Sequence, residues 1–167
     1  MREAVGGSSL FYLVIFFAGF VMITFVGILS YSKAYRVKNR IIELVEKYEV
    51  YESVSGKVDA VDAINPDLKN AGYDASKPTR CNSESVKNHL KEILPDEYHK
   101  KLPENKNNIG YNYCIFEINS NKYPKKISNG KFYVVVTFVR YEFPIIGDVL
   151  TFPVYGETKI LGKTYDY

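Results

Sequence analysis

The side chains that could take part in chemistry are few in this chain, and they lie far apart. Four of them are common metal ligands: Cys81, His89, His99 and Cys114. Metal sites that can be recognised in a sequence place ligands in pairs about two to five residues apart. These four residues form no such pair, so we expect no bound metal and no other cofactor.

Local motifs for catalysis cannot be recognised either. The sequence has no evident Ser-His-Asp or Cys-His arrangement and no glycine-rich phosphate loop. Asp59, Asp62 and Asp67 lack the glycine and the closing glutamate of a calcium loop, so they are expected on a solvated helix face. His89 and His99 lie in polar segments, where solvated side chains are the simpler interpretation than catalytic bases. The sequence predicts a protein that is not an enzyme and that has no small-molecule substrate.

Cys81 and Cys114 are the two cysteines of the chain, and they could form a disulfide with each other. In an oxidising compartment they can form a disulfide that ties a loop to a strand. In a cytosolic domain, two unrelated buried thiols would be expected instead. A disulfide across this separation would stabilise the domain by about 3–4 kcal/mol in a chain-entropy estimate.

The element that must position everything else is an uncharged run of twenty residues, Leu10–Leu29. About 20 apolar residues in a helix cross a bilayer core of about 30 Å, and lipid requires every backbone polar group to be bonded within the segment. A removable signal peptide has a shorter apolar stretch and a small-residue cleavage site. Here Tyr31 and Tyr35 follow the run, as aromatic residues do at a membrane interface. We expect an uncleaved transmembrane helix at residues 10–30, after a short N-terminal segment at residues 1–9.

Small residues recur near one face of this predicted helix, where they would let another membrane helix approach closely. They are Gly19, Gly27, Ser30 and Ala34. The alternative is ordinary composition, because glycine is common in spanning helices.

The helical pattern continues beyond the membrane as an amphipathic extension at residues 31–54. Apolar residues recur at steps of three and four, and charged residues occupy the other face. One helix should therefore run from about Ser9 to about Glu52, with Ser55-Gly56 as its stop. We expect its apolar stripe to pack on the sheet of the head domain. The residues predicted at this contact are Ile41, Leu44, Val45 and Tyr48 on the helix and Val134 and Val136 on the sheet.

Residues 55–167 are predicted to form one small α+β head. A helical stretch from about Val58 to Ala71 should break at Asn65-Pro66. A further helix, capped by Ser83 or Ser85, should run to about Leu94.

After Gly110 the periodicity changes to two, which indicates strands. The predicted strands are Tyr111–Ile118, Lys131–Phe143, Asp148–Val154 and Thr158–Leu161. Asn129-Gly130 is a hairpin signal before the second of them. That strand is apolar on both faces, so it should be the central one, and Pro153 fits best on an edge strand.

Charge gives conflicting indications of topology. The net charge of +3 comes from 22 basic and 19 acidic residues scattered along the chain, so nucleic acid is not an expected partner. Lys33, Arg36, Lys38 and Arg40 follow the span, which would keep the head in the cytoplasm by the positive-inside rule. Large domains can be translocated despite such charge, and the cysteine pair suits an oxidising compartment. We favour an extracytoplasmic head on a single-pass membrane protein.

Three segments carry a narrower likeness. They are Gly6-Gly7-Ser8-Ser9 before the apolar run, YSKAYRVKNRIIELVEKYE at Tyr31–Glu49, and FPIIGDVLTFPVYGETKIL at Phe143–Leu161. Together they resemble TadE-like minor pseudopilins of tight-adherence (Tad) pilus loci or related type II and type IV secretion loci. The resemblance implies a pilin-like α+β fold, in which a long N-terminal transmembrane helix continues as a spine packed on a small antiparallel β-sheet.

One residue departs from the pilin pattern. Pilin-type signals carry a glutamate five positions into the mature chain, and a cut after Gly7 would put Tyr12 there. This departure favours a minor or accessory subunit over a major filament subunit.

The predicted function is therefore structural. The chain would be an anchored accessory subunit of a bacterial surface pilus or secretion filament, with the membrane and other pilus or secretion-system subunits as its partners. The alternative function is a stand-alone membrane-anchored extracytoplasmic binding or sensor domain.

Overall fold

The structure is a computed structural model of the chain. It describes residues 2–51, 60–71, 73, 80–94, 96, 99–107, 113–119, 130–143 and 147–162, with the backbone alone at 2–7, 141–143 and 147–150. The predicted helix stop at Ser55-Gly56, Asp59 and Asn129 of the hairpin signal lie outside the described residues.

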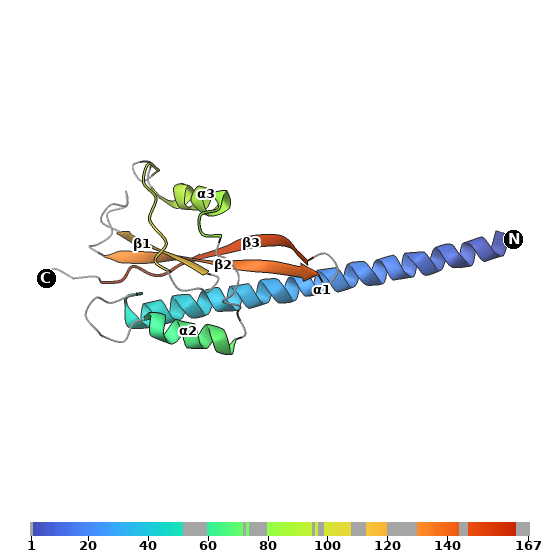
Figure 1. Cartoon of the computed structure of the whole chain (residues 1–167), viewed down its shortest axis with the longest axis horizontal. Helices are drawn as coiled ribbons and strands as arrows, with labels where there is room; N and C mark the ends of the chain where they lie inside the picture. The colour runs from blue at the N-terminus through green and yellow to red at the C-terminus, as the bar shows by residue number, and fades with distance from the viewer. Residues whose placement is uncertain are drawn as a thin grey trace.

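A single helix, α1 (Arg2–Tyr48), forms the long axis of the molecule (Figure 1). It is continuous through the predicted boundary between the apolar run and the amphipathic extension. The helix ends before Glu49, whose φ of 59° is in the left-handed region that commonly terminates helices. The predicted end near Glu52 was therefore too late, because the apolar pattern itself continues to Tyr51.

Three antiparallel strands form the sheet: β1 (Tyr113–Asn119), β2 (Lys131–Phe143) and β3 (Gly147–Glu157). Their order is β1-β2-β3, so the strand that is apolar on both faces is central, as predicted. Pro153 lies on β3 at an edge of this sheet, where its missing N–H interrupts no ladder. The predicted strand Thr158–Leu161 is instead a single bridge between Lys131 and Leu161.

The two faces of β2 belong to two different hydrophobic clusters. One face, with Tyr133 and Val135, packs on α1 and α2. The other face, with Val134, Val136 and Phe138, packs on α3 (Glu84–Ile93). Figure 1 shows α1 and α3 on opposite sides of the sheet.

This arrangement corrects the predicted partners of the spine on the sheet. Ile41, Leu44 and Val45 are buried, and Tyr48 packs partly buried beside them, but their cluster contains Tyr133 and Val135. Val134 and Val136 point to the opposite face. Side chains alternate along a strand, and both sets on β2 are apolar, so the sequence could not distinguish the two faces.

The second helix, α2 (Ala60–Asn70), continues through Pro66, so the predicted break at Asn65-Pro66 is wrong. Proline leaves the carbonyl four residues earlier without its helical partner. That residue is Asp62, which is exposed, as is Pro66. Water can hydrogen-bond a carbonyl on this side, while Ile64 and Leu68 hold the opposite side in the core.

The third helix, α3, has Ser83 as its N-cap, one of the two predicted candidates, and it ends at Leu94 as predicted. Val86, Leu90 and Leu94 form its buried stripe. The architecture as a whole is pilin-like and α+β: a long apolar N-terminal helix packed on a small antiparallel sheet.

The packing of α1 on β2 predicts the effect of truncating its stripe. Leu44→Ala should lower the free energy of unfolding of the head by about 2–5 kcal/mol, because it leaves a cavity in the cluster. Glu43→Ala, on the exposed face one residue earlier, should cost only about a few tenths of a kcal/mol. Chemical denaturation of the full chain in detergent measures both. Equal effects of the two substitutions would contradict the packed spine.

Candidate assembly site on the anchor helix

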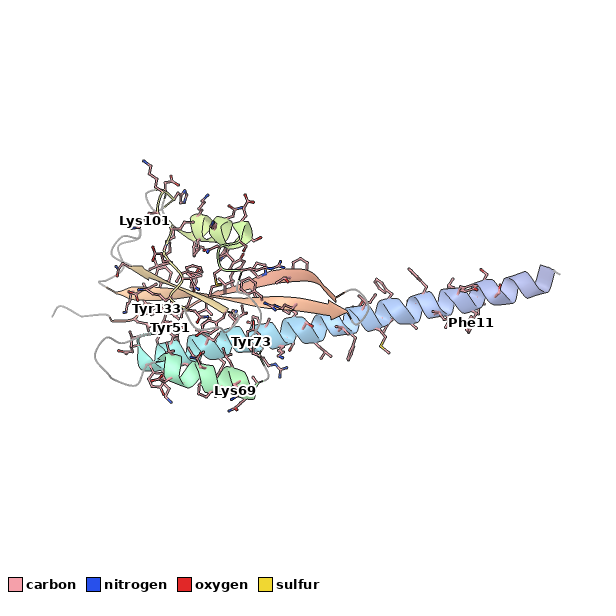
Figure 2. The ribbon with its side chains drawn as sticks, viewed as in Figure 1. Phe11, Tyr51, Lys69, Tyr73, Lys101 and Tyr133 are labelled. Carbon is pink, nitrogen blue, oxygen red and sulfur yellow. A yellow bond between two sulfur atoms is a disulfide. The ribbon has the colours of Figure 1, made fainter. Side chains whose placement is uncertain are left out.

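The N-terminal half of α1 carries apolar side chains that the described part of the chain leaves uncovered. Phe11 is 63% exposed, Phe16 78% and Met22 70%. Figure 2 shows Phe11 on the length of α1 that extends beyond the head. By contrast, Ile41 and Val45 are fully buried. The N-terminal half of α1 therefore exposes an apolar surface, whereas its C-terminal half is buried against the head. An exposed apolar surface of this size indicates contact with a membrane or with another protein.

Lipid is one possible cover, because α1 contains a segment that is long and apolar enough to cross a membrane. Tyr31 and Tyr35 stack at 6.3 Å between ring centroids just beyond the apolar run. Both rings are exposed, as amphipathic aromatic residues at a bilayer interface would be.

The predicted small-residue face does not form one free surface. Gly19 is open, since a Cβ built there has no atom within 4 Å. Gly27 is buried and Ser30 half-buried. Ala34 is 2% exposed, and its carbonyl accepts a hydrogen bond of 3.0 Å from the Thr137 hydroxyl of β2.

These small residues continue the stripe that faces the head. Steps of three and four residues lead from Ser30 to Ala34, Val37 and Ile41, which places them on one side of the helix. A small residue at position 34 leaves room for β2 to lie against the helix backbone. The expectation that Ala34 faces another membrane helix is therefore corrected, and Gly19 is the member of the set that remains open.

A second close approach joins α1 to β3. A Cβ added to Gly156 would lie 2.8 Å from Ile42 Cδ1 and 2.8 Å from Lys38 Cδ. Lys38 is only 8% exposed, and its ammonium lies 4.2 Å from the centre of the Tyr35 ring. Its aliphatic stem is packed while its charge rests on an aromatic face.

The sequence did not predict this contact: Gly156 was not singled out, and Lys38 was expected on the charged face of the helix, whereas it is buried. A glycine inside an edge strand is a general signal of close backbone approach. That signal could have identified Gly156, although not its partners.

An exposed ion pair fastens α2 beside α1. Arg40 Nε lies 2.6 Å from Asp67 Oδ2, and its Nη1 lies 2.9 Å from Glu43 Oε2. Hydrogen bonds to Asp67 and then to Glu43 raise the pKa of Arg40 above its ordinary value. Asp67 is therefore a partner of the spine rather than a purely solvated residue.

Buried tyrosines close the far end of the spine. The Tyr51 and Tyr113 hydroxyls lie 2.7 Å apart, and the Tyr51 N–H donates to the Tyr133 hydroxyl at 3.3 Å. Tyr51 and Tyr133 lie together near the end of α1 in Figure 2. The Tyr133 hydroxyl also donates to Glu117 at 3.1 Å, and burial raises the pKa of Tyr133. These phenols satisfy polar groups at the end of the helix and fix where β1 and β2 meet it.

Cys81 and Cys114 form a disulfide with a Cα–Cα distance of 5.6 Å. Both residues are buried in the cluster under α3. The bond ties the segment before α3 to β1, which is the connection predicted for an oxidising compartment.

The two histidines pack rather than lie free in solvent. His89 stacks on Tyr155 with 3.7 Å between ring centroids, which joins α3 to β3. His99 Nε2 lies 2.8 Å from the Lys91 carbonyl and 3.1 Å from the Leu94 carbonyl, at the end of α3. Within the described ranges, no group of three or more His, Cys, Asp or Glu side chains could hold a metal ion.

Comparison with known proteins adds no family to this picture. No protein-family model, curated protein or solved structure matches the chain.

The approach of β3 to α1 predicts the outcome of enlarging Gly156. Gly156→Val should lower the free energy of unfolding by about 1–3 kcal/mol, because the added atoms overlap Ile42 and Lys38. Gly156→Ala should cost less, since it adds one carbon atom where valine adds three. Gly19→Ala, where the space is open, is the control and should leave the denaturation midpoint of the head unchanged. A Gly156→Val protein as stable as the control would contradict this contact.

Removing the disulfide should also weaken the head. The double substitution Cys81→Ser, Cys114→Ser should lower the free energy of unfolding by about 3–4 kcal/mol in the chain-entropy estimate. Denaturation of the unsubstituted protein with and without reductant gives an independent measure. Reductant should have no effect on the double variant, and a shift there would mean that the loss has another cause.

Proposed function

We propose that this chain is a membrane-anchored structural subunit, a minor pseudopilin-like accessory protein of a bacterial surface pilus or secretion filament. The observation that carries the proposal is the exposed apolar half of α1. It continues without a break into a spine that is buried against the sheet of the head. A helix of this kind holds a head at a membrane and offers a surface for packing to other membrane helices.

The absence of the pilin glutamate supports an accessory position. Tyr12 occupies the corresponding position if the chain is cut after Gly7. A subunit without that carboxylate lacks the charge that meets a neighbouring N-terminus in the core of a filament. Such a subunit suits initiation, capping or assistance of assembly.

We place the head outside the cytoplasm. The disulfide between Cys81 and Cys114 supports this side, since such bonds persist in oxidising compartments. The opposing argument is the basic cluster after the span, and two of its four charges are engaged by the protein itself. Lys38 lies over Tyr35, and Arg40 pairs with Asp67 and Glu43. These contacts form in the folded head and do not change the count of basic residues, so the proposed orientation rests on the disulfide.

The topology is tested by thiol labelling in intact cells. Cys81 and Cys114 should resist alkylation until a reductant is added, and protease added outside the cells should reach the head. Free thiols combined with a protease-protected head would place the head in the cytoplasm and overturn this orientation.

The assembly role is tested by adding bulk at the open small residue. Gly19→Leu should reduce crosslinking of the anchor to other pilus or secretion-system subunits, because close helix approach depends on small residues. A photo-reactive residue at Phe16, which is 78% exposed, provides the crosslink in intact cells. Membrane insertion and the disulfide should be unchanged.

Ala18→Leu is the matched control, since it adds similar bulk one position around the helix. An equal loss in both variants would argue against a specific small-residue contact. A chain that crosslinks to lipid alone, in both the unsubstituted protein and the variants, would favour a stand-alone anchored domain.

A further inference from the structure

A groove of about 550 Å³ lies between α1 and α2, close to the point where the apolar run ends. Leu29, Lys33, Arg36 and Arg40 line it from α1, and Asp67 and Leu68 line it from α2. The four α1 residues follow one another at steps of four, three and four, so they share one side of the helix.

We propose that this groove binds the headgroup phosphate of an anionic phospholipid. The inference rests on the proposed function in one respect, which is that the apolar run of α1 lies in a bilayer. It goes beyond that function by assigning a lipid class and a binding site to the junction between anchor and head.

The depth of the groove suits a headgroup. Leu29 is the last residue of the apolar run, and a helix rises about 1.5 Å per residue. Lys33 and Arg36 therefore lie about 6 Å and about 10 Å beyond the edge of the hydrocarbon core. The headgroup layer on each side of a bilayer is about 5–8 Å thick, and long basic side chains can reach back into it.

The charges of the groove favour an anion. Three of its lining residues are basic, and Asp67 is the one acidic residue among them. Its carboxylate is already 2.6 Å from Arg40 Nε. Lys33 and Arg36 both lie on the exposed surface of α1, and both line the groove.

The apolar part of the groove favours a lipid over a free phosphate. Leu29 is 55% exposed and contributes hydrocarbon surface beside the basic residues. The side of α1 that carries Leu29 continues into the membrane through Val26 and Met22, at steps of three and four residues. An acyl chain can follow this side of the helix while its phosphate meets Lys33 and Arg36.

The second wall is held in place without a ligand. Leu68 is 2% exposed in the core cluster, and the Arg40–Asp67 pair joins α2 to α1 on the outer side. A preformed groove loses little conformational entropy when it is filled.

The experiment uses the full chain in nanodiscs that contain phosphatidylcholine and phosphatidylglycerol together. Native mass spectrometry after release should show phosphatidylglycerol retained in preference to phosphatidylcholine. The double variant Lys33→Gln, Arg36→Gln should lose this preference by roughly tenfold or more, since each basic residue near the surface contributes to anionic-lipid binding. The control variant Lys47→Gln, Lys87→Gln removes the same charge from exposed positions outside the groove and should retain the preference.

Each outcome bears on one part of the inference. Equal retention of phosphatidylglycerol by the double variant and the unsubstituted protein would overturn it. Loss of the preference in the control variant would mean nonspecific charge attraction and would also overturn it. Displacement of the lipid by soluble inorganic phosphate at low concentration would assign the groove to a free phosphate instead.

The proposed function fails separately from this inference. Flotation of the protein with liposomes of phosphatidylcholine alone tests the anchor, whatever the groove binds. A protein that floats but has no lipid preference would support the membrane anchor and contradict the lipid site in the groove. A protein that does not float contradicts the anchor itself.

Discussion

The packing of one stripe of α1 against the central strand β2 is the contact on which the rest of the structure depends. Ile41 and Val45 are fully buried there, in a cluster with Tyr133 and Val135. The approach is close enough for the Thr137 hydroxyl of β2 to reach the backbone carbonyl of Ala34. Since a three-stranded sheet needs cover for its apolar face, the helix supplies that cover and is in turn fixed by it.

The continuity of α1 links this contact to the apolar half of the helix, which is long and apolar enough to cross a membrane. An uninterrupted helix is stiff over short lengths, so the position of its apolar half determines where the head sits. The connection is reinforced where the two halves meet, through β3 at Gly156 and through the Arg40–Asp67 pair on the other side. The proposed structural role and the proposed lipid site both depend on this rigid junction.

The sequence predicted the long helix, the α+β class and the limits of β2, because hydrophobic periodicity is strong in these segments. It also predicted the pairing of Cys81 with Cys114 as one of two alternatives. It could not choose which face of β2 meets the spine, because Val134 and Val136 are as apolar as Tyr133 and Val135. The predicted break at Pro66 was wrong. An exposed proline can remain inside a helix when the opposite side of that helix is packed in the core, as Ile64 and Leu68 are here. The sequence could not show that Ala34 faces β2 while Gly19 remains open. A small side chain allows close approach of either a partner helix or a nearby strand.

The central claim is that one continuous helix crosses a bilayer with its first half and is buried by the head with its second. Spin labels placed singly at Phe16, Met22, Tyr35 and Glu43 of the full chain in liposomes measure this directly, through their accessibility to oxygen and to a water-soluble relaxation agent. The account predicts that labels at Phe16 and Met22 are reached by oxygen and protected from the aqueous agent. It predicts that the label at Tyr35 is at the transition and that the label at Glu43 is reached by the aqueous agent. Aqueous access at Phe16 and Met22 equal to that at Glu43 would contradict the account.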